Sequence, residues 1–217
     1  METRKLYYED PFQKGFATTV VSCDEVKGGY AVVLAETAFY PEGGGQPCDT
    51  GTLGGADVTE TLLRGETVLH RCTAALPVGA DVTGEIDWAR RLDLMQQHSG
   101  EHLVSGLIHA RFGYENVGFH LGADLVTIDF NGEVDEQALQ ELERAANEAV
   151  WADFVPHIWY PEPDELAHLP YRSKKALTGA VRLVQFGDID LCACCGTHVA
   201  RTGEIGLIKL FLSLIHI

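Results

Sequence analysis

Two short motifs, each offering two metal ligands, constrain this chain more than any other feature. The stretch HSGEH places His98 and His102 four residues apart, and the stretch CCGTH does the same for Cys194 and His198. Residues four apart on a helix share one face, so the two imidazoles of the first motif can reach one ion. If one ion takes all four side chains, the fold must bring together two segments that lie far apart in the sequence.

The four side chains form a His₃Cys donor set, which suits Zn²⁺ better than Mg²⁺ or Ca²⁺. Cys195 also lies within one turn of His198, so the spacing alone does not choose the ligand cysteine. Two other interpretations stay open. The histidines and cysteines can be buried side chains without a metal, and HSGEH also fits H-x-x-E-H, a zinc-peptidase signature.

In the peptidase interpretation, Glu101 is the general base and a later helix supplies a carboxylate ligand, for example Glu141 or Glu148. That interpretation leaves the cysteine motif unexplained. Helical geometry turns Glu101 away from the face shared by His98 and His102, so its other expected role is a solvated surface carboxylate.

The composition favours a globular, cytoplasmic protein. A chain of 217 residues that is 46% apolar can bury a core in one large domain or two small ones. No segment approaches the roughly 20 apolar residues of a membrane span, and the start METRKLYYEDPF lacks the apolar stretch of a signal peptide. Three of the six cysteines lie close to His198, which favours metal ligation over disulfides. Because the sequence predicts neither a membrane span nor a signal peptide, we expect no membrane partner.

The hydropathy pattern predicts an α+β chain with two domains. Residues 1–88 consist of short strand-like runs separated by glycines, which predicts a small β-barrel. From Ala89 the stretch ARRLDLMQQHSGEHLVSGLIHARFG predicts a helix that ends at Gly113. A second helix with Asp135 as its N-cap and the runs LVTIDF, VPHIWY, VRLVQFGDIDL and EIGLIKLFL complete a two-layer α/β domain over residues 89–217.

A glycine-rich loop, FYPEGGGQPCDTG, occupies residues 39–51 between two predicted strands. Three consecutive glycines leave backbone N–H groups uncovered, so this loop can approach a ligand closely. The alternative is a hairpin turn with no ligand.

The last six residues, LSLIHI, form an apolar run without a polar tail. They match one reading frame of a common sequencing adapter, so we expect residues 212–217 to be read-through and the natural chain to continue past Phe211. The alternative is an ordinary terminal strand.

Four stretches resemble, in order and spacing, the free-standing alanyl-tRNA editing proteins, which are related to the editing domain of alanyl-tRNA synthetase. They are FYPEGGGQPCDTG, RLDLMQQHSGEHLVSG, VGFHLGADLVTIDF and CACCGTHVARTGEIGLIKL. The resemblance runs from about Leu6 to Leu210, and the glycine-rich stretch favours the longer subclass with an N-terminal barrel. It implies a Zn²⁺ site and chooses Cys194 over Cys195; the implied ligands are His98, His102, Cys194 and His198.

The resemblance also implies a substrate pocket, with the glycine loop and one later stretch as its walls. The residues assigned to it are Gly43, Gly44, Gly45, Gln46, Gly118 and His120. The implied reaction is zinc-dependent hydrolysis, in trans, of the ester that joins serine or glycine to tRNA(Ala). The expected nucleophile is a zinc-bound water, and no residue is assigned as general base. The alternative functions are a zinc peptidase and a non-catalytic, zinc-stapled module that binds tRNA or a synthetase.

The charge distribution restricts where tRNA can bind. The formal net charge of −16 argues against non-specific binding of nucleic acid, and no DNA partner is expected. Residues 171–217, however, hold six basic residues against three acidic ones. We expect tRNA to contact this region through Arg172, Lys174, Lys175 and Arg182. Arg90 and Arg91 are further candidates for tRNA contact.

Overall fold

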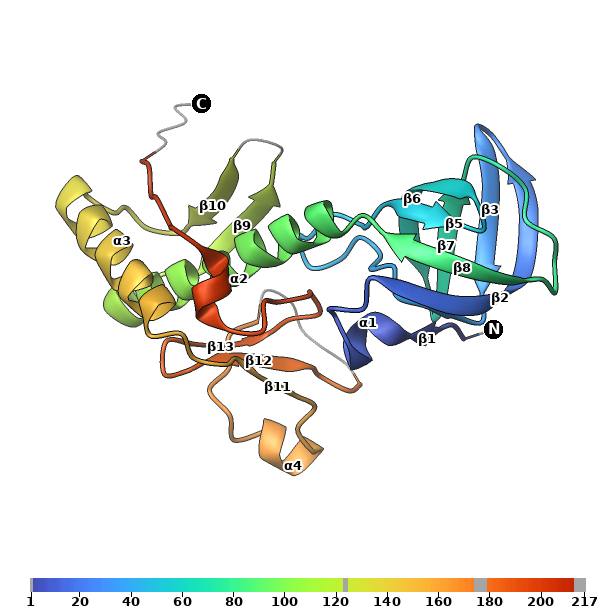
Figure 1. The fold of residues 1–217 in the computed structure, drawn as a ribbon. Coiled ribbons are helices and arrows are strands. Elements are labelled where there is room, and N and C mark those ends of the chain that lie inside the picture. The colour runs from blue at the N-terminus through green and yellow to red at the C-terminus, as the bar shows by residue number, and fades with distance from the viewer. Residues whose placement is uncertain (1, 123–124, 174–178, 213–217) are drawn as a thin grey trace. The chain divides into compact units, whose positions relative to one another are not determined.

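The computed structural model describes residues 2–122, 125–173 and 179–212 (Figure 1). Two of the predicted tRNA contacts, Lys174 and Lys175, lie outside the described residues. So do residues 213–217 of the predicted read-through segment. Two compact units, residues 1–94 and 95–217, make up the chain. The division falls inside helix α2, Trp88–Phe112, whereas the sequence pattern placed it at the start of this helix. Helices and strands occur together, so the predicted α+β class is confirmed.

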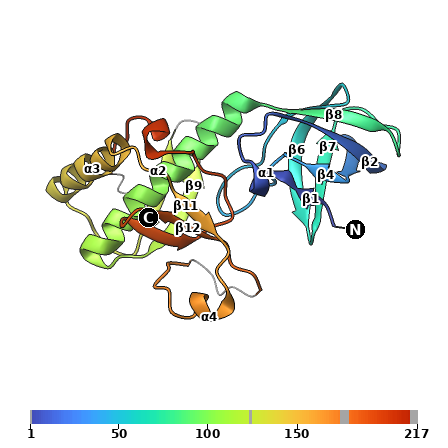
Figure 2. The same cartoon turned by 60° about the horizontal axis from the view of Figure 1, so that its bottom comes forward.

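The unit of residues 1–94 is built mainly of strands. Each of six strands pairs with two others in the cyclic order β2-β3-β7-β6-β5-β8, which closes the sheet into a barrel (Figures 1 and 2). The short strand β1 pairs in parallel with β4. The elements are β1 Arg4–Lys5, α1 Leu6–Glu9, β2 Gly15–Val26, β3 Gly29–Leu34, β4 Glu36–Thr37, β5 Gly51–Leu53, β6 Ala56–Arg64, β7 Thr67–Cys72 and β8 Asp81–Ile86.

Alternating side chains explain this closed sheet. In β7, every second residue is buried, as expected for a strand with one face toward a core. The inward side chains form one apolar cluster that includes Val32, Leu53 and Val58. Gly51 is required where β5 begins, because its φ is +156° and a Cβ there would lie 2.1 Å from the carbonyl oxygen of Glu85.

The unit of residues 95–217 combines two small sheets with helices. Strands β9 and β10 form an antiparallel hairpin, and β11, β12 and β13 form an antiparallel sheet in that order (Figure 1). After α2, the elements are β9 Asn116–Leu121, β10 Val126–Phe130, α3 Glu136–Trp151, β11 His157–Trp159, α4 Pro163–Leu166, β12 Leu183–Phe186, β13 Asp190–Ala193 and the 3-10 helix η1 Thr202–Ile205.

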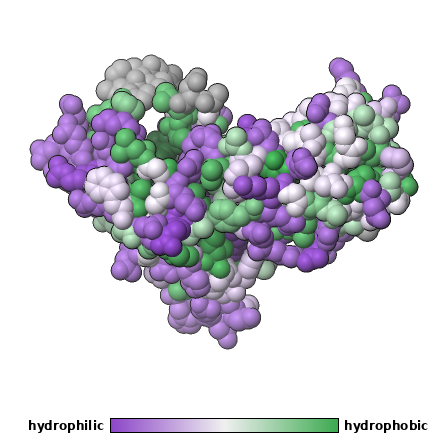
Figure 3. Space-filling view, in the orientation of Figure 1, coloured by the Kyte–Doolittle hydropathy of each residue, from purple (hydrophilic) through white to green (hydrophobic). Residues whose placement is uncertain are grey.

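Both predicted helix boundaries are confirmed. Helix α2 ends at Phe112, and Gly113 follows with a φ of +69°. The Asp135 carboxylate accepts a hydrogen bond from the N–H of Ala138 at 2.8 Å and so caps α3. Helices α2 and α3 share an apolar cluster formed by Val104, Ile108, Leu142 and Ala146. Hydrophilic residues dominate the outer surface over α3 and α4 (Figure 3).

One predicted run differs from the structure. EIGLIKLFL begins inside the 3-10 helix Thr202–Ile205, and its described residues 206–212 form no strand. The N–H of Ile208 and that of Leu210 instead bond to side chains of α3, Asn147 at 3.0 Å and Glu143 at 2.8 Å. Among the described helices, none has the length and apolar character of a membrane span.

Candidate metal centre

The four predicted ligand side chains converge within the unit of residues 95–217. Helix α2 supplies His98 and His102, and the bend after β13 supplies Cys194 and His198. One donor atom of each lies within 4.8 Å of the others. The Cys194 sulfur lies 3.4 Å from Nε2 of His98 and 3.5 Å from Nε2 of His198. Four donors at this spacing can surround one cation.

The burial of the cluster fits a bound cation. His98, His102 and His198 are each at most 2% exposed. Nε2 of His102 is buried and has no hydrogen-bond partner among the described residues. A buried polar atom without a partner is costly, and a metal ion at the centre of the cluster would satisfy this one.

Neighbouring groups hold the other nitrogen of two of these rings. Nδ1 of His102 lies 2.7 Å from Oδ2 of Asp190, and Nδ1 of His198 lies 3.3 Å from Oγ of Ser99. The same hydroxyl accepts a hydrogen bond from the N–H of Val199 at 3.2 Å. With Nδ1 engaged in both rings, their Nε2 atoms are the ones available to a metal.

Charge in the cluster favours a cation. Burial would raise the pKa of the Cys194 thiol, but the adjacent His98 and His198 lower that pKa well below its usual value. Burial would lower the pKa of His102, but the Asp190 carboxylate and the Cys194 sulfur raise it well above its usual value. Burial lowers the pKa of His198 to about 3. The Cys194 thiolate is therefore stabilised by positive charge on its neighbours, and a divalent ion that replaced the His102 proton would supply that charge instead.

The other cysteines differ from Cys194. All six cysteines are free thiols. Cys195 is not among the converging donors, whereas Cys192 lies with His102 and Asp190 in a second, overlapping group. Burial raises the pKa of Cys192 to about 11, which keeps its thiol protonated and makes it a poor ligand.

Aromatic rings line the cluster. Phe186 of β12 stacks on His102 with ring centroids 5.2 Å apart, and Phe119 of β9 packs on His98 at 5.3 Å. Successive side chains of a strand point to opposite faces, so His120 and Gly118 face away from Phe119. His120, the predicted pocket residue, is exposed, and its neighbour Phe119 is the one that contacts a predicted ligand. The sequence motifs did not single out Phe119, and the assignment of His120 to the substrate pocket stays a prediction.

Glu101 is not the solvated surface carboxylate that helical geometry predicts. It is only 5% exposed and accepts hydrogen bonds from Oγ of Ser105 at 2.7 Å and Nδ2 of Asn116 at 2.5 Å. The expectation is wrong because α2 is buried on all sides at this level, where every residue from 98 to 106 is buried.

The structure gives two of the predicted tRNA contacts internal partners. Nε of Arg172 donates to Oδ1 of Asp190 at 2.8 Å, and the Arg172 side chain is only 10% exposed. Nη1 of Arg182 donates to the carbonyl oxygens of Cys194 and Gly196, at 2.8 and 3.0 Å. Arg182 therefore supports the bend that carries two of the predicted ligands.

The glycine loop of residues 1–94 forms a tight turn. The N–H of Gly43 bonds to the carbonyl of Gln46 at 3.1 Å, and the reverse bond measures 3.0 Å. Gly44 and Gly45 both have positive φ, the combination of a type I′ turn. Both N–H groups of the Gly43–Gln46 pair are thus engaged, and the Gln46 side chain is buried. Gly44 and Gly45 are the exposed residues of this turn.

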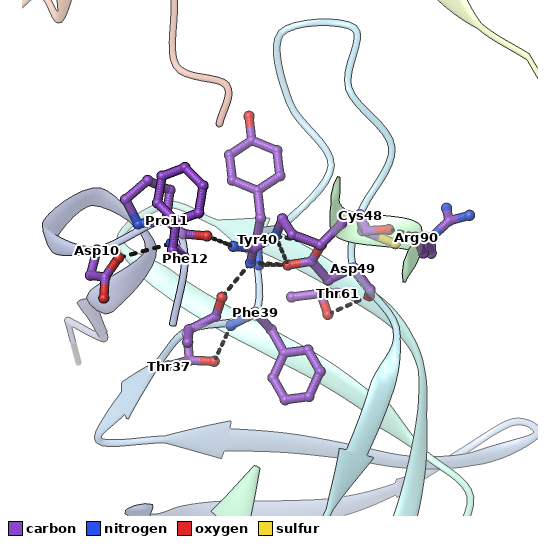
Figure 4. Close-up of polar contacts among 12 residues, drawn as sticks. Asp10, Pro11, Phe12, Thr37, Phe39, Tyr40, Cys48, Asp49, Thr61 and Arg90 are labelled. Atoms are coloured by element: carbon purple, nitrogen blue, oxygen red, sulfur yellow. Dashed lines mark hydrogen bonds and ion pairs between the residues drawn. The ribbon is translucent and has the colours of Figure 1, made fainter. Parts of the chain in front are cut away.

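A buried ion pair fixes the base of this loop. The Asp49 carboxylate accepts a hydrogen bond from the N–H of Tyr40 at 2.6 Å, and Thr61 donates to the Asp49 carbonyl (Figure 4). The same carboxylate accepts from the Arg91 guanidinium. Arg91 also donates to the carbonyl oxygens of Pro11 and Ala38. Arg91 is therefore buried inside residues 1–94, and Nε of Arg90 donates to the Cys48 carbonyl at 3.1 Å. Both further candidates for tRNA contact thus have internal partners.

Comparison with known proteins finds similarity to domains of tRNA synthetases and to alanyl-tRNA editing proteins. Residues 181–213 match the "Threonyl and Alanyl tRNA synthetase second additional domain", and residues 8–90 match "tRNA synthetases class II (A)". The chain is 34% identical to the alanyl-tRNA editing protein Aarsd1 of Danio rerio and 32% identical to the alanyl-tRNA editing protein AlaX-L of Pyrococcus horikoshii. It is 37% identical to the alanine–tRNA ligase of Pyrococcus abyssi.

These matches cover most of this chain but only part of its relatives. They include 93% and 95% of the chain for the two editing proteins and 96% for the ligase. The chain spans about half the length of the editing proteins, 53% of each, and 24% of the ligase. The predicted resemblance is confirmed: over nearly all of its length, this chain is a relative of the alanyl-tRNA editing proteins and of the matching quarter of alanine–tRNA ligases.

Proposed function

We propose that this chain hydrolyses the ester bond of mischarged tRNA(Ala), carrying serine or glycine, with one Zn²⁺ held by His98, His102, Cys194 and His198. The observation that carries the proposal is the convergence of these four donors, from two distant segments, within 4.8 Å of one another. The similarity to alanyl-tRNA editing proteins supports the substrate class. The donor set supports the choice of metal, because three imidazoles and one thiolate suit Zn²⁺.

The need for such an activity follows from the chemistry of the amino acids. Glycine lacks one methyl group of alanine and serine adds one hydroxyl, so a single binding pocket discriminates weakly between them. A second, hydrolytic site removes the errors. Water adds to the ester carbonyl and the bond from the carbonyl carbon to the ribose oxygen breaks. The ribose oxygen takes up one proton of the water and becomes the tRNA hydroxyl, while the amino acid leaves as a carboxylate and the other proton is released.

The chain's own residues prepare the site for this reaction. Asp190 and Ser99 hold Nδ1 of His102 and of His198, which leaves Nε2 of each ring for the ion. Phe119 and Phe186 cover the rings and limit the access of bulk water. When bound, Zn²⁺ lowers the pKa of water and polarises a carbonyl oxygen.

Glu101 does not support the peptidase alternative. A peptidase base must be directed at the water it activates, whereas Glu101 is buried and accepts hydrogen bonds from Ser105 and Asn116. We therefore assign Glu101 a structural role and leave the general base unassigned.

For tRNA contact we keep Lys174 and Lys175 as the main proposal. Arg172 and Arg182 have internal partners and would contribute less to affinity. The glycine loop and the stretch around Gly118 and His120 remain the proposed contacts to the aminoacyl end.

The test is a deacylation assay on Ser-, Gly- and Ala-tRNA(Ala), run with and without a metal chelator. We expect Ser-tRNA(Ala) or Gly-tRNA(Ala) to be hydrolysed much faster than Ala-tRNA(Ala), and the activity to be lost with chelator and restored by Zn²⁺. Equal hydrolysis of Ala-tRNA(Ala) would contradict an editing role. Binding of tRNA without hydrolysis would favour the non-catalytic module, and peptide cleavage that survives Cys194→Ala would favour the peptidase.

A further inference from the structure

A buried chain of three side chains reaches the cluster from β13. Nδ1 of His102 lies 2.7 Å from Oδ2 of Asp190, and the second oxygen of this carboxylate accepts a hydrogen bond from Nε of Arg172 at 2.8 Å. The side chains of His102 and Asp190 are 2% and 1% exposed. A buried carboxylate shared by an arginine and an imidazole is held firmly in one orientation.

The backbone fixes Arg172 in this position. Its N–H donates to the carbonyl of Leu191 at 2.8 Å, and its carbonyl accepts from the N–H of Ala193 at 2.9 Å. Arg172 therefore pairs with β13 through an isolated parallel bridge to Cys192. The guanidinium and the carboxylate that it holds thus belong to neighbouring, paired segments.

A glycine on α2 allows Asp190 to come this close. Gly106 lies one turn after His102, and a Cβ at this position would be 2.4 Å from the carbonyl oxygen of Ile189 and 2.7 Å from Cβ of Asp190. Both distances are shorter than side-chain contacts allow, so any larger residue would push the start of β13 away from the helix. The sequence thus provides a specific place for the Asp190 carboxylate beside His102.

The opposite side of the same ring has spare bonding capacity. In the neutral ring, with Nδ1–H donating to Asp190, Nε2 carries the lone pair, and it is buried without a hydrogen-bond partner among the described residues. Metal-binding histidines commonly donate their other N–H to a carboxylate, which fixes the tautomer and the ring orientation.

We propose that Asp190, held by Arg172, is a positioning residue that fixes His102 as a metal ligand through Nε2. This inference rests on the proposed metal site and adds two residues that act through a ligand without touching the ion.

The test compares zinc affinity in Asp190→Asn and in a matched control, Asp188→Asn. Both variants remove one negative charge from the same β12–β13 hairpin, but Asp188 is exposed in the turn. An asparagine at 190 cannot accept from both His102 and Arg172, because one of its two polar atoms is a donor. We expect Asp190→Asn to weaken zinc binding about 10- to 100-fold and Asp188→Asn to change it less than about twofold.

Three readouts separate positioning from folding. Competition with a chelating dye gives the zinc affinity, the absorption spectrum of the Co²⁺-loaded protein reports ligand geometry, and melting of the metal-free protein reports stability. We expect the cobalt spectrum of Asp190→Asn to change while the metal-free protein still melts cooperatively. Gly106→Ala should change the spectrum in the same direction, because it displaces the carboxylate without removing it.

Wild-type zinc affinity and an unchanged cobalt spectrum in Asp190→Asn would overturn the inference. If this variant does not fold, Arg172→Gln takes its place, with the same two results for and against. Cys194→Ser keeps this test separate from the proposed function. Wild-type zinc affinity in Cys194→Ser would refute the metal site itself, whereas a loss there together with no loss in Asp190→Asn would refute only the positioning role.

Discussion

Both units of the molecule contain buried histidines, and His70 of the barrel differs from His102 of the other unit in how its ring nitrogens are used. In the barrel, Nε2 of His70 lies 2.8 Å from Oγ1 of Thr37 and Nδ1 lies 3.1 Å from the carbonyl of Val32. In the candidate metal centre, Nδ1 of His102 is paired with Asp190, but Nε2 has no such partner among the described residues. Burial alone therefore does not mark a ligand, whereas an unfilled bonding position on a buried ring does.

The buried arginine–aspartate pairs show the same contrast. Arg91 and Asp49 bond to each other and to three backbone groups, of Tyr40, Pro11 and Ala38. This network makes its hydrogen bonds within residues 1–94 and holds the base of the glycine loop. Arg172 and Asp190 instead transmit their orientation to His102, the ring with the unfilled position. We infer that the network of Arg91 and Asp49 stabilises the fold, whereas the network of Arg172 and Asp190 serves metal binding through His102.

Exchanging the two histidines for alanine tests the contrast most strongly. His102→Ala removes one of four ligands, and we expect zinc affinity to fall at least about 1000-fold, or about 4 kcal/mol. His70→Ala should leave zinc affinity unchanged but lower the free energy of unfolding by about 3 kcal/mol, because it opens a cavity and removes the hydrogen bonds of the ring to Thr37 and Val32. Dye competition and urea unfolding measure the two effects. Similar losses of zinc affinity in both variants would show that the contrast has no functional meaning.

The pH dependence of stability gives a smaller effect with a defined sign. Burial lowers the pKa of His70 from 6.5 to about 4. The unfolded chain then binds the extra proton first, so the contribution of His70 is complete above pH 6.5 and is lost as the pH falls toward 4. Because His70 is protonated in the unfolded chain but not in the folded one at pH 5, we expect its contribution to the free energy of unfolding to be about 2 kcal/mol lower at pH 5 than at pH 7.5.

Urea unfolding of the metal-free protein at the two pH values measures this loss, with His70→Gln as the control. The difference between wild type and His70→Gln should shrink on acidification. An identical pH dependence in the two proteins would mean that His70 is not buried as a neutral ring.

Glu101→Gln should give the smallest effect. The glutamine oxygen can still accept from Ser105 and Asn116, which both bond to one oxygen of the carboxylate. We expect deacylation of Ser- or Gly-tRNA(Ala) to fall less than about threefold, against the 100-fold or greater loss typical of a missing general base. A loss of 100-fold or more would indicate that Glu101 takes part in catalysis and would support the peptidase interpretation.

The sequence was sufficient for the parts of the site that depend on local spacing. His98 and His102 one turn apart, the helix end at Gly113 and the cap at Asp135 all follow from helical periodicity and end signals. The convergence of the two motifs follows from the chemistry of the ligand set and from the family resemblance, since spacing left Cys194 and Cys195 equivalent.

The parts that depend on tertiary packing could not be read from the sequence. Asp190 and Arg172 carry no motif, and only the pairing of Arg172 with β13 and the opening at Gly106 bring them to His102. Glu101 was misplaced because periodicity assumes that one face of a helix meets solvent. Phe119 was missed because the strand register that separates it from His120 is set by the pairing of β9 with β10.

We propose that three imidazoles and one thiolate, brought together from two segments, hold one zinc ion. X-ray absorption at the zinc edge of the loaded protein tests it most directly. We predict one zinc per chain with one sulfur at about 2.3 Å and about three nitrogens at 2.0–2.1 Å. A first coordination shell of nitrogen and oxygen alone, without sulfur, would contradict the claim.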